Sequence, residues 1–335
     1  MEWLGSLAAG LAGQLGSPTL AFMIGGMLLV ALGSKLQVPG AIYQFIVFML
    51  LMRIGLKGGI EIREAEMGSM VLPALIAVVM GVAIVVAGGL VLGRLRNVKR
   101  EDGIATAGLF GAVSASTLAA GMVFLEEKNV PFEAWVPALY PFMDIPALLS
   151  AIVLANLHLS KQPGGSRTHS LRSIVRESLQ SSALSALLFG MALGLFAETG
   201  ALVDEFYDPL FKGFLSILMM IMGMEAYSRL HELRKVAHWY AVYAVVAPVL
   251  HGLAAFVLGY VAHRLVGFSP GGVVLLAVMA ASSSDISGPP TLRASIPSAN
   301  PSAYIGSSTG IGTPVAIALC IPLFYALAQV VFDLP

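Results

Sequence analysis

Long apolar runs recur from one end of the chain to the other, and a helix made of one such run would be about as long as a lipid bilayer is thick. A helix needs roughly 20 apolar residues to cross the hydrocarbon core, because each residue advances the helix by about 1.5 Å. Within lipid, only helices and closed barrels satisfy every backbone hydrogen bond, and runs of this length favour helices. The sequence therefore predicts an all-α integral membrane protein. Its ten expected segments are residues 18–34, 38–57, 70–93, 103–125, 136–157, 181–198, 209–228, 238–263, 270–289 and 303–331.

The composition excludes several other classes of protein. Hydrophobic residues make up 57% of the 335 residues and charged residues 11%, whereas soluble domains carry about 25% charged residues. The 19 basic and 19 acidic residues balance, so no basic surface indicates nucleic-acid binding. The single cysteine, Cys320, rules out an intrachain disulfide or a cysteine metal cluster. We expect a multi-pass protein surrounded by membrane lipid.

The chain lacks the motifs that indicate ATP hydrolysis or metal-dependent proteolysis. It contains no Walker A or HExxH pattern, and its six histidines do not show the spacing of metal ligands. The sequence thus predicts a protein that is not an enzyme and that needs no cofactor.

Lysine and arginine residues predict how the chain is oriented, because cytoplasmic loops carry an excess of them. Ten spans place both ends of the chain on the same side of the membrane. If that side is the outside, 13 of the 19 basic residues lie in cytoplasmic loops, and the opposite orientation leaves six there. We therefore expect both termini outside and the linker at residues 161–180 on the cytoplasmic side.

That linker separates two halves of five segments each, residues 1–160 and 181–335, and several motifs in the halves align at one constant offset. Coincidence between simple apolar sequences is the alternative explanation. An odd number of spans makes the second half enter the membrane in the opposite sense, so we predict two inverted five-helix repeats, as in many secondary transporters. The aligned pairs, all 168 residues apart, are Gly55 and Gly223, Ala112 and Ala280, Ser114 and Ser282, Ser116 and Ser284, Thr117 and Asp285, and Pro146 and Pro314.

Polar or Gly/Pro clusters interrupt the fourth, ninth and tenth segments, and the fourth and ninth occupy equivalent places in the two halves. Their clusters are GAVSASTLAAG at 111–121 and ASSSDISGPP at 281–290. A helix within lipid breaks only where its freed N–H and C=O groups meet protein, water or a ligand. Free N–H groups at a half-helix start attract a small anion, and hydroxyl, carbonyl and carboxylate oxygens suit sodium. Close packing of small residues between helices is the alternative reason for any one of these serines.

We expect the two polar clusters to approach each other and to form one shared site. Asp285 is its strongest candidate, because a carboxylate in the middle of a span costs about 2.5–3.5 kcal/mol and calls for a functional reason. Gly288, Pro289 and Pro290 then end this segment, since proline cannot continue a helix. The expected anion-binding residues are Ala112, Val113, Ser114, Ser282, Ser283 and Ser284, and the expected sodium ligands are Ser116, Thr117, Ser284, Asp285, Asp144 and Thr313.

Three other charged residues, Glu225, Arg53 and Lys57, each lie near the end of an apolar segment. Long charged side chains at such positions usually reach the membrane surface. We expect this simple role for all three, with a binding role as the alternative for Glu225.

Three long stretches carry a family resemblance. Residues 125–148 read LEEKNVPFEAWVPALYPFMDIPAL, residues 205–240 begin with EFYDPLFKGF, and residues 280–324 begin with AASSSDISGPP. In these stretches the chain closely resembles the cyanobacterial sodium-dependent bicarbonate transporters of the SbtA family. The similarity covers nearly the whole chain, from SPTLAFMIGGMLL to the last segment.

The resemblance implies a symporter that brings sodium and bicarbonate into the cell across the plasma (inner) membrane, to supply carbon fixation. It implies a homotrimer in which segments one, two, six and seven form a gate subdomain and the others form a core subdomain. It also implies inhibition by a PII-like protein, SbtB, at the cytoplasmic face. A passive small-anion channel, another sodium-coupled small-anion symporter and a membrane scaffold are the alternatives.

Overall fold

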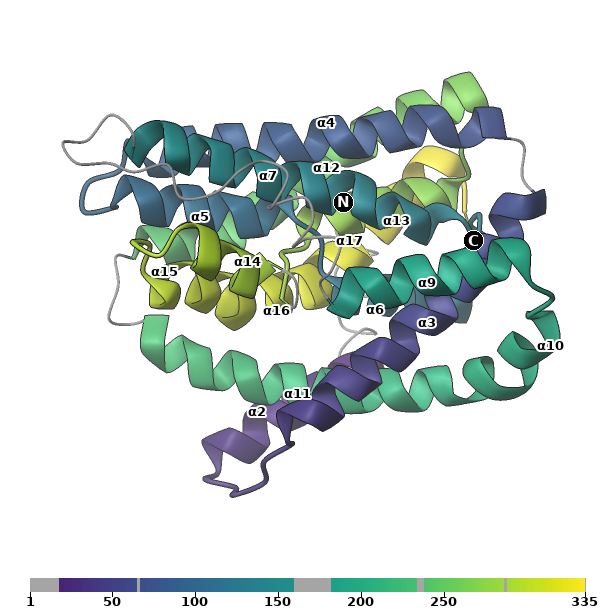
Figure 1. Cartoon of the computed structure of the whole chain (residues 1–335), viewed down its shortest axis with the longest axis horizontal. Helices are drawn as coiled ribbons and strands as arrows, with labels where there is room; N and C mark the ends of the chain where they lie inside the picture. Colours follow the sequence, from purple (N-terminus) through teal and green to yellow (C-terminus); the bar gives the residue numbers. More distant parts are fainter. Residues whose placement is uncertain (1–17, 65–66, 160–181, 234–237, 286–287, 335) are drawn as a thin grey trace.

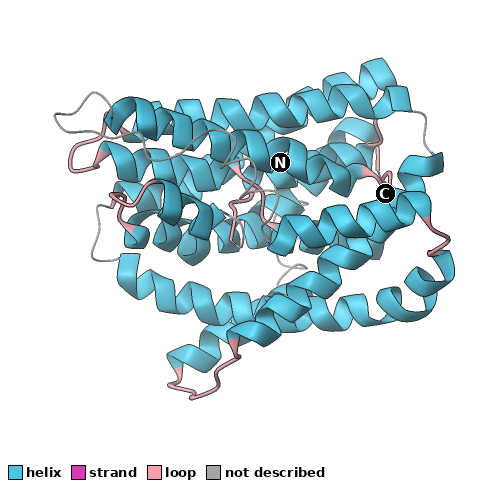
Figure 2. Cartoon of the chain, viewed as in Figure 1, coloured by secondary structure: helices cyan, strands magenta, loops and turns pink. Residues whose placement is uncertain are grey.

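The computed structural model is helical throughout the part of the chain that it describes, and no β-strand occurs there (Figures 1 and 2). The described residues are 18–64, 67–159, 182–233, 238–285 and 288–334. The all-α prediction is therefore confirmed. The expected linker at residues 161–180 lies outside the described residues.

Within the described residues, seven stretches of helix are long and apolar enough to cross a membrane. Three further apolar helices, at Ala21–Ala31, Ser185–Phe196 and Pro270–Ala281, are shorter. Seven long apolar helices make this a multi-pass membrane protein, and the number of crossings beyond seven stays a prediction.

Helices from both halves of the sequence form what we call the lower layer, in the lower part of Figure 1. Its elements are α2 (Pro18–Ala31), α3 (Gly40–Glu64), α9 (Ser182–Phe196), α10 (Gly200–Leu202), η2 (Val203–Tyr207) and α11 (Asp208–Leu233). Here α2 packs against α11, and α3 packs against α9. Glycines let the backbones touch: a Cβ at Gly223 would lie 1.9 Å from the carbonyl oxygen of Met23, and a Cβ at Gly55 would lie 2.3 Å from that of Leu187.

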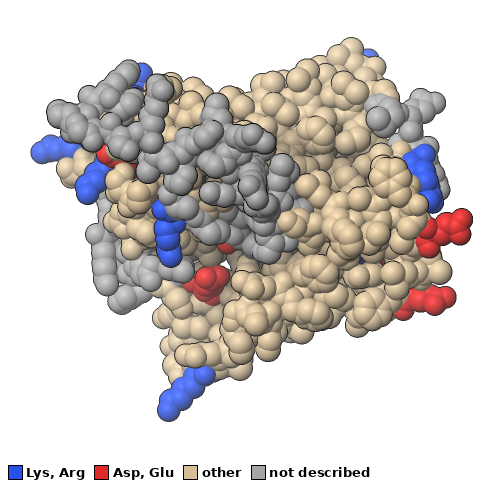
Figure 3. All heavy atoms as spheres, viewed as in Figure 1, with Lys and Arg blue, Asp and Glu red and all other residues tan. Residues whose placement is uncertain are grey.

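The remaining helices form the upper layer. Its elements are α4 (Met67–Leu92), α5 (Arg100–Gly111), α6 (Ala115–Glu127), η1 (Val136–Leu139), α7 (Tyr140–Leu159), α12 (Trp239–Val266), α13 (Pro270–Ala281), α14 (Gly288–Ser295), α15 (Pro301–Ser307), η3 (Ser308–Gly312), α16 (Thr313–Val315), η4 (Ala316–Cys320) and α17 (Ile321–Phe332). In this layer α4 packs against α5 and α7, and α12 packs against α13. Both α4 and α12 expose large apolar side chains, such as Val71 and Val257, which are 66% and 62% exposed. Most charged side chains in Figure 3 lie toward the ends of the molecule, as expected where helices run across a bilayer.

The lower layer contains the segments that the family resemblance assigns to a gate subdomain, and the upper layer contains the others. The division into a gate subdomain and a core subdomain stays a prediction. That they move relative to each other stays a prediction.

The tenth expected segment is helical, but its helix is widened at two places. π-helical turns, η3 and η4, flank Pro314, whose missing N–H prevents a regular α-helical ladder. The stretch GSSTG at 306–310 matches the GxSxG pattern of hydrolase nucleophiles. It lies on this helix and not on the strand-to-helix turn that such a nucleophile needs. The interruption expected from the sequence is thus a local widening rather than a break.

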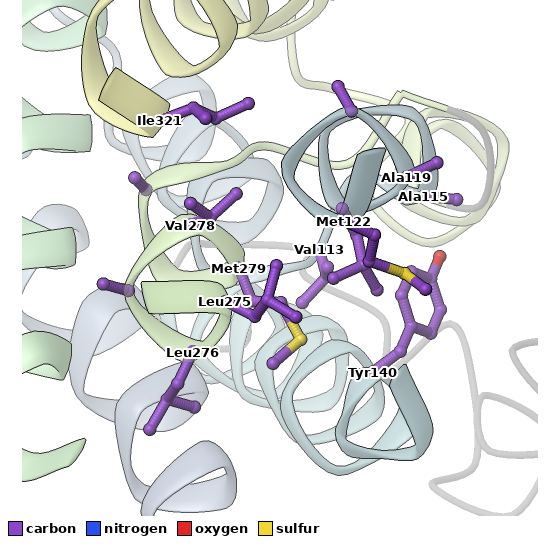
Figure 4. Close-up of a cluster of buried hydrophobic side chains, with 14 of the residues drawn as sticks. Val113, Ala115, Ala119, Met122, Tyr140, Leu275, Leu276, Val278, Met279 and Ile321 are labelled. Atoms are coloured by element: carbon purple, nitrogen blue, oxygen red, sulfur yellow. The ribbon is translucent and has the colours of Figure 1, made fainter. Parts of the chain in front are cut away.

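Two of the helices that lead to or from the polar clusters are enclosed by protein. Every residue of α13 from Gly271 to Ala281 is buried, and so is every residue of α6 from Ala115 to Leu125. Figure 4 shows side chains of both helices in one apolar cluster with Tyr140 of α7 and Ile321 of α17. The helix ends beside this cluster consequently face protein instead of lipid.

Candidate functional site

The first break separates α5 from α6 and consists of Ala112, Val113 and Ser114. The backbone of Ala112 and of Ser114 is extended, with ψ angles of 157° and 118°. The Ser114 Oγ accepts a hydrogen bond from the Thr117 N–H at 3.1 Å. Serine is favoured at this position because the bond satisfies an N–H that the first helical turn leaves without a partner. The sequence Ser-Ala-Ser-Thr therefore restarts the helix here.

The second break follows α13 and begins at Ser282, whose backbone is also extended. The Ser284 N–H donates to the carbonyl oxygen of Leu109, on α5, at 2.9 Å. The Ser284 Oγ accepts a hydrogen bond from the Gly288 N–H at 2.9 Å. Hydrogen bonds thus hold this break against the helix that leads into the first one.

The expectation that Gly288, Pro289 and Pro290 end the ninth segment is wrong, because these residues begin α14. Proline lacks an N–H, but the first turn of a helix has no internal acceptor for one, so proline fits there. The ninth segment therefore resumes as a short helix after its break, as the fourth segment resumes as α6.

The two breaks are in direct contact, as the sequence predicted. The Ser114 N–H donates to the Ser282 Oγ at 2.9 Å, and these residues are 168 positions apart. The Ser116 Oγ–H donates to the Asp285 Oδ2 at 2.6 Å and lies 2.9 Å from the Ser114 Oγ. Asp285 is only partly buried, whereas the three serines are fully buried. One connected group of oxygens therefore joins the two halves of the chain.

Four oxygens in or near this group have no hydrogen-bond partner among the described residues. They are the Thr117 Oγ1, the Ser283 Oγ, the Asp285 Oδ1 and the Thr313 Oγ1, all of them shielded from solvent. Buried polar atoms nearly always have a partner, so a gathering of such atoms indicates a place for a ligand or water. Hydroxyl and carboxylate oxygens are the ligands that hard cations prefer. These oxygens are therefore of the kind that a small cation binds.

Asp144 contacts the first break from α7. It is fully buried, and its Oδ1 accepts a hydrogen bond from the Val113 N–H at 3.0 Å. Among the expected sodium ligands, Ser116 and Asp285 are thus in direct contact, while Asp144 binds a backbone amide. Thr313 follows Gly312, where an added Cβ would lie 3.1 Å from the Ser283 Oγ.

Most backbone N–H groups expected to meet an anion already have protein acceptors in this conformation. The Val113 N–H donates to Asp144, and the Ser114 N–H donates to Ser282. The N–H groups of Ala112, Ser282 and Ser284 donate to backbone carbonyl oxygens. An anion that binds these groups must take the place of one of the acceptors. The anion-binding role of the six residues stays a prediction.

A cavity of about 510 Å³ lies between α11 and the connection from α2 to α3. Tyr43 and Glu225, on its wall, lie within electrostatic range of Asp285. The expectation that Glu225 lies at a helix end is wrong, because α11 continues to Leu233. The residues that line the cavity are Val30, Ser34, Leu36, Gln37, Val38, Gly40, Tyr43, Ile221, Met224, Glu225 and Ser228.

The role expected for Arg53 is also wrong. Its side chain does not reach the membrane surface, because only 4% of it is exposed. Its Nε donates to the Asp208 Oδ1 at 2.6 Å, and its guanidinium carbon lies 4.2 Å from the ring centroid of Phe211. One signal of this burial is visible in the sequence, since apolar residues flank Arg53 on both sides in LLMRIGL.

One comparison with known proteins gives a match. A family model described as the Na+-dependent bicarbonate transporter superfamily matches residues 18–329. A search of curated proteins finds no match. The matched range includes both breaks, the cavity and the buried arginine.

Proposed function

The chain belongs to the Na+-dependent bicarbonate transporter superfamily, and we propose that it is a secondary active transporter that couples bicarbonate uptake to sodium entry. The observation that carries this proposal is the contact between the two breaks, where Ser116 binds Asp285 beside oxygens that have no partner among the described residues. A cation held there would be neutralised by one carboxylate. A cation and an anion that share one site would each raise the affinity for the other, which is what symport needs.

Sodium would be held by Asp285, Thr117 and Thr313, with Ser116, Ser284 and Asp144 as further ligands or supports. Bicarbonate is a small planar anion that needs hydrogen-bond donors more than a large apolar pocket. It would bind at Ala112, Val113, Ser114, Ser282, Ser283 and Ser284. The bond between Ser114 and Ser282 joins the two breaks, so an anion that enters between them would replace it.

The proposed architecture has ten spans in two inverted repeats, residues 1–160 and 181–335. Contact between Ser114 and Ser282, which the alignment pairs, supports it. The aligned glycines Gly55 and Gly223 also make matching backbone contacts, one between α3 and α9 and the other between α2 and α11. A pair of inverted repeats exchanges these two helix pairs, because each contains the first span of one half and the second span of the other.

The transporter would lie in the plasma (inner) membrane with both termini outside, as a homotrimer regulated by the PII-like protein SbtB at the cytoplasmic face. The excess of basic residues in alternate connections supports this orientation. A cysteine introduced at Arg96 should react with an impermeant thiol reagent only from the cytoplasmic side. Labelling from outside in intact cells would contradict both the orientation and the proposed docking face.

Uptake of labelled bicarbonate into proteoliposomes tests the function. Accumulation that requires an inward sodium gradient is the expected result. Equilibration without a sodium gradient would indicate a passive anion channel, and no flux at all would indicate a scaffold. Sodium-driven uptake of a different small anion would keep the coupling but change the substrate.

A further inference from the structure

Arg53 connects the two layers of the molecule. It lies on α3 in the lower layer, and its second carboxylate contact is with Glu126 on α6 in the upper layer, where Nη2 and Oε1 are 3.6 Å apart. Its Nη1 is buried and has no hydrogen-bond partner in the part of the chain that the structure describes. The Arg53 guanidinium is thus held weakly on the side of Glu126, because that contact is long and Nη1 donates no hydrogen bond among the described residues.

The contacts of Arg53 with its own layer are closer. Asp208 and Phe211 both belong to α11, and the distance from the Arg53 Nε to the Asp208 carboxylate is 2.6 Å, a length typical of a strong charge-assisted bond. The arginine is therefore anchored on the lower layer and reaches across to Glu126. If the layers move apart, the contact with Glu126 breaks first.

Glu126 stands near the end of the helix that begins at the first break. Ser116 and Thr117 lie in the first turn of α6, and Glu126 is in its last turn. One uninterrupted helix of 13 residues joins these two turns. A contact at Glu126 thus restrains the helix that carries the proposed sodium ligands.

Arg53 and the large cavity lie apart from each other along the same two helices. Gly40 and Tyr43 line the cavity at the start of α3, and Arg53 follows Gly40 by roughly 20 Å along the helix. On α11, Glu225 lines the cavity and Asp208 is at the other end. The region that is open at the cavity and the region held by Arg53 are therefore different.

We propose that Arg53 and Glu126 form a positioning contact of the transport cycle, which holds α6 against the lower layer while the cavity beside Glu225 is open. The contact between Arg53 and Glu126 breaks when the two layers separate near Arg53. This inference rests on the proposed function, because it assigns the contact to a conformational change of a transporter. Arg53 acts through α6 and does not itself bind the transported ions.

Gly58 offers a place to detect this separation. It is buried, and a Cβ at this position would lie 3.5 Å from the carbonyl oxygen of Ala134, in the connection between α6 and η1 of the upper layer, an ordinary contact distance. The present conformation therefore has room for the Cβ of a Gly58→Cys variant, whose thiol becomes reachable when the layers separate. The only native cysteine, Cys320, is buried and is replaced by alanine in the background.

The test measures the rate at which a water-soluble maleimide modifies the Gly58→Cys variant of the full chain in lipid nanodiscs, where both membrane faces are accessible. Glu126→Gln should raise this rate about 1.5-fold to fivefold, the range expected from losing one partly exposed ion pair. Glu127→Gln is the matched control, because it changes the exposed neighbouring residue, and it should leave the rate unchanged. If Glu126→Gln is not recovered in folded form, Glu126→Asp replaces it in the test, and the modification rate should then rise by a smaller factor.

Asp208→Asn separates a positioning role from a merely structural one. It loosens Arg53 from its own layer and leaves the contact with Glu126, so the modification rate should stay the same or fall. An unchanged rate in Glu126→Gln, or an equal rise in Glu126→Gln and Asp208→Asn, would overturn the proposal. The measurement needs no substrate, so its failure leaves the uptake result standing. Absence of sodium-driven uptake would likewise leave the labelling result standing.

Discussion

The two breaks have similar backbones and unequal hydrogen bonding. In the first break, the N–H groups of Val113 and Ser114 are held by side chains of other elements. In the second break, Ser283 and Asp285 each keep a shielded oxygen without a partner among the described residues. Hydrogen bonds therefore hold both breaks, and the second break also keeps two shielded oxygens that could bind a ligand.

The aligned positions explain this difference. Asp144 corresponds to Gly312 at the offset of 168, and Thr117 corresponds to Asp285. In the first half, the carboxylate stands on a neighbouring helix and holds the break. In the second half, the carboxylate belongs to the break itself, and a glycine faces Ser283. The carboxylate of the first repeat thus supports its break, and the carboxylate of the second repeat is placed to act as a charged ligand.

Removal of the Asp285 charge should have the largest effect on transport. Asp285→Asn keeps the size of the side chain and one acceptor oxygen, but it loses a charge-assisted contact worth roughly 1.5–3 kcal/mol. The half-saturating sodium concentration for uptake should therefore rise by about one to two orders of magnitude. Uptake at a series of sodium concentrations measures it.

Asp204→Asn is the matched control for this variant, because Asp204 is an exposed carboxylate on η2. It should leave the sodium dependence unchanged. If Asp285→Asn also leaves it unchanged, Asp285 is not the charged ligand, and Asp144 becomes the next candidate.

Loss of the Asp144 carboxylate should mainly reduce stability. Asp144→Ala leaves the buried Val113 N–H without its acceptor, which costs about 1–3 kcal/mol. The apparent melting temperature in detergent should fall clearly below that of the parent. Asp285→Ala should lower it less, because one oxygen of Asp285 has no partner among the described residues. Equal losses of stability would show that the two breaks do not differ as described.

The place and nature of the breaks could be predicted from the sequence, and their hydrogen bonding could not. Clusters of Ser, Gly and Pro inside apolar segments mark a break wherever they occur, and a repeat makes two such clusters equivalent. The acceptor of the Val113 N–H, in contrast, is 31 positions away. The carboxylate that anchors Arg53 is 155 positions away. Such partners are set by how helices pack, which residue spacing along one segment does not determine.

A neutral ligand in the helix that follows the first break should matter less than the charged one on the second break. Thr117→Ala removes a hydroxyl whose net contribution is about 0.5–1.5 kcal/mol, so the half-saturating sodium concentration should rise about twofold to tenfold. Thr117→Ser keeps the hydroxyl and serves as the control. A rise as large as that of Asp285→Asn would indicate that charge does not distinguish the two breaks.

The smallest effect on stability should come from the serine that has no partner. Ser282 and Ser283 are adjacent and fully buried, yet the Ser282 Oγ accepts the Ser114 N–H, while the Ser283 Oγ has no hydrogen bond among the described residues. Ser282→Ala removes an acceptor from a buried N–H and should cost about 1–3 kcal/mol. Ser283→Ala removes no such bond, so the melting temperature should stay close to that of the parent.

Uptake distinguishes the two serines in a second way. If the Ser283 hydroxyl meets the transported anion, Ser283→Ala should raise the half-saturating bicarbonate concentration about twofold to tenfold, the range for one neutral hydrogen bond. A variant with unchanged stability and weaker bicarbonate uptake would place the ligand at the second break. If Ser283→Ala destabilises the protein as much as Ser282→Ala does, the hydroxyl of Ser283 already has a structural partner, and the second break is as firmly held as the first.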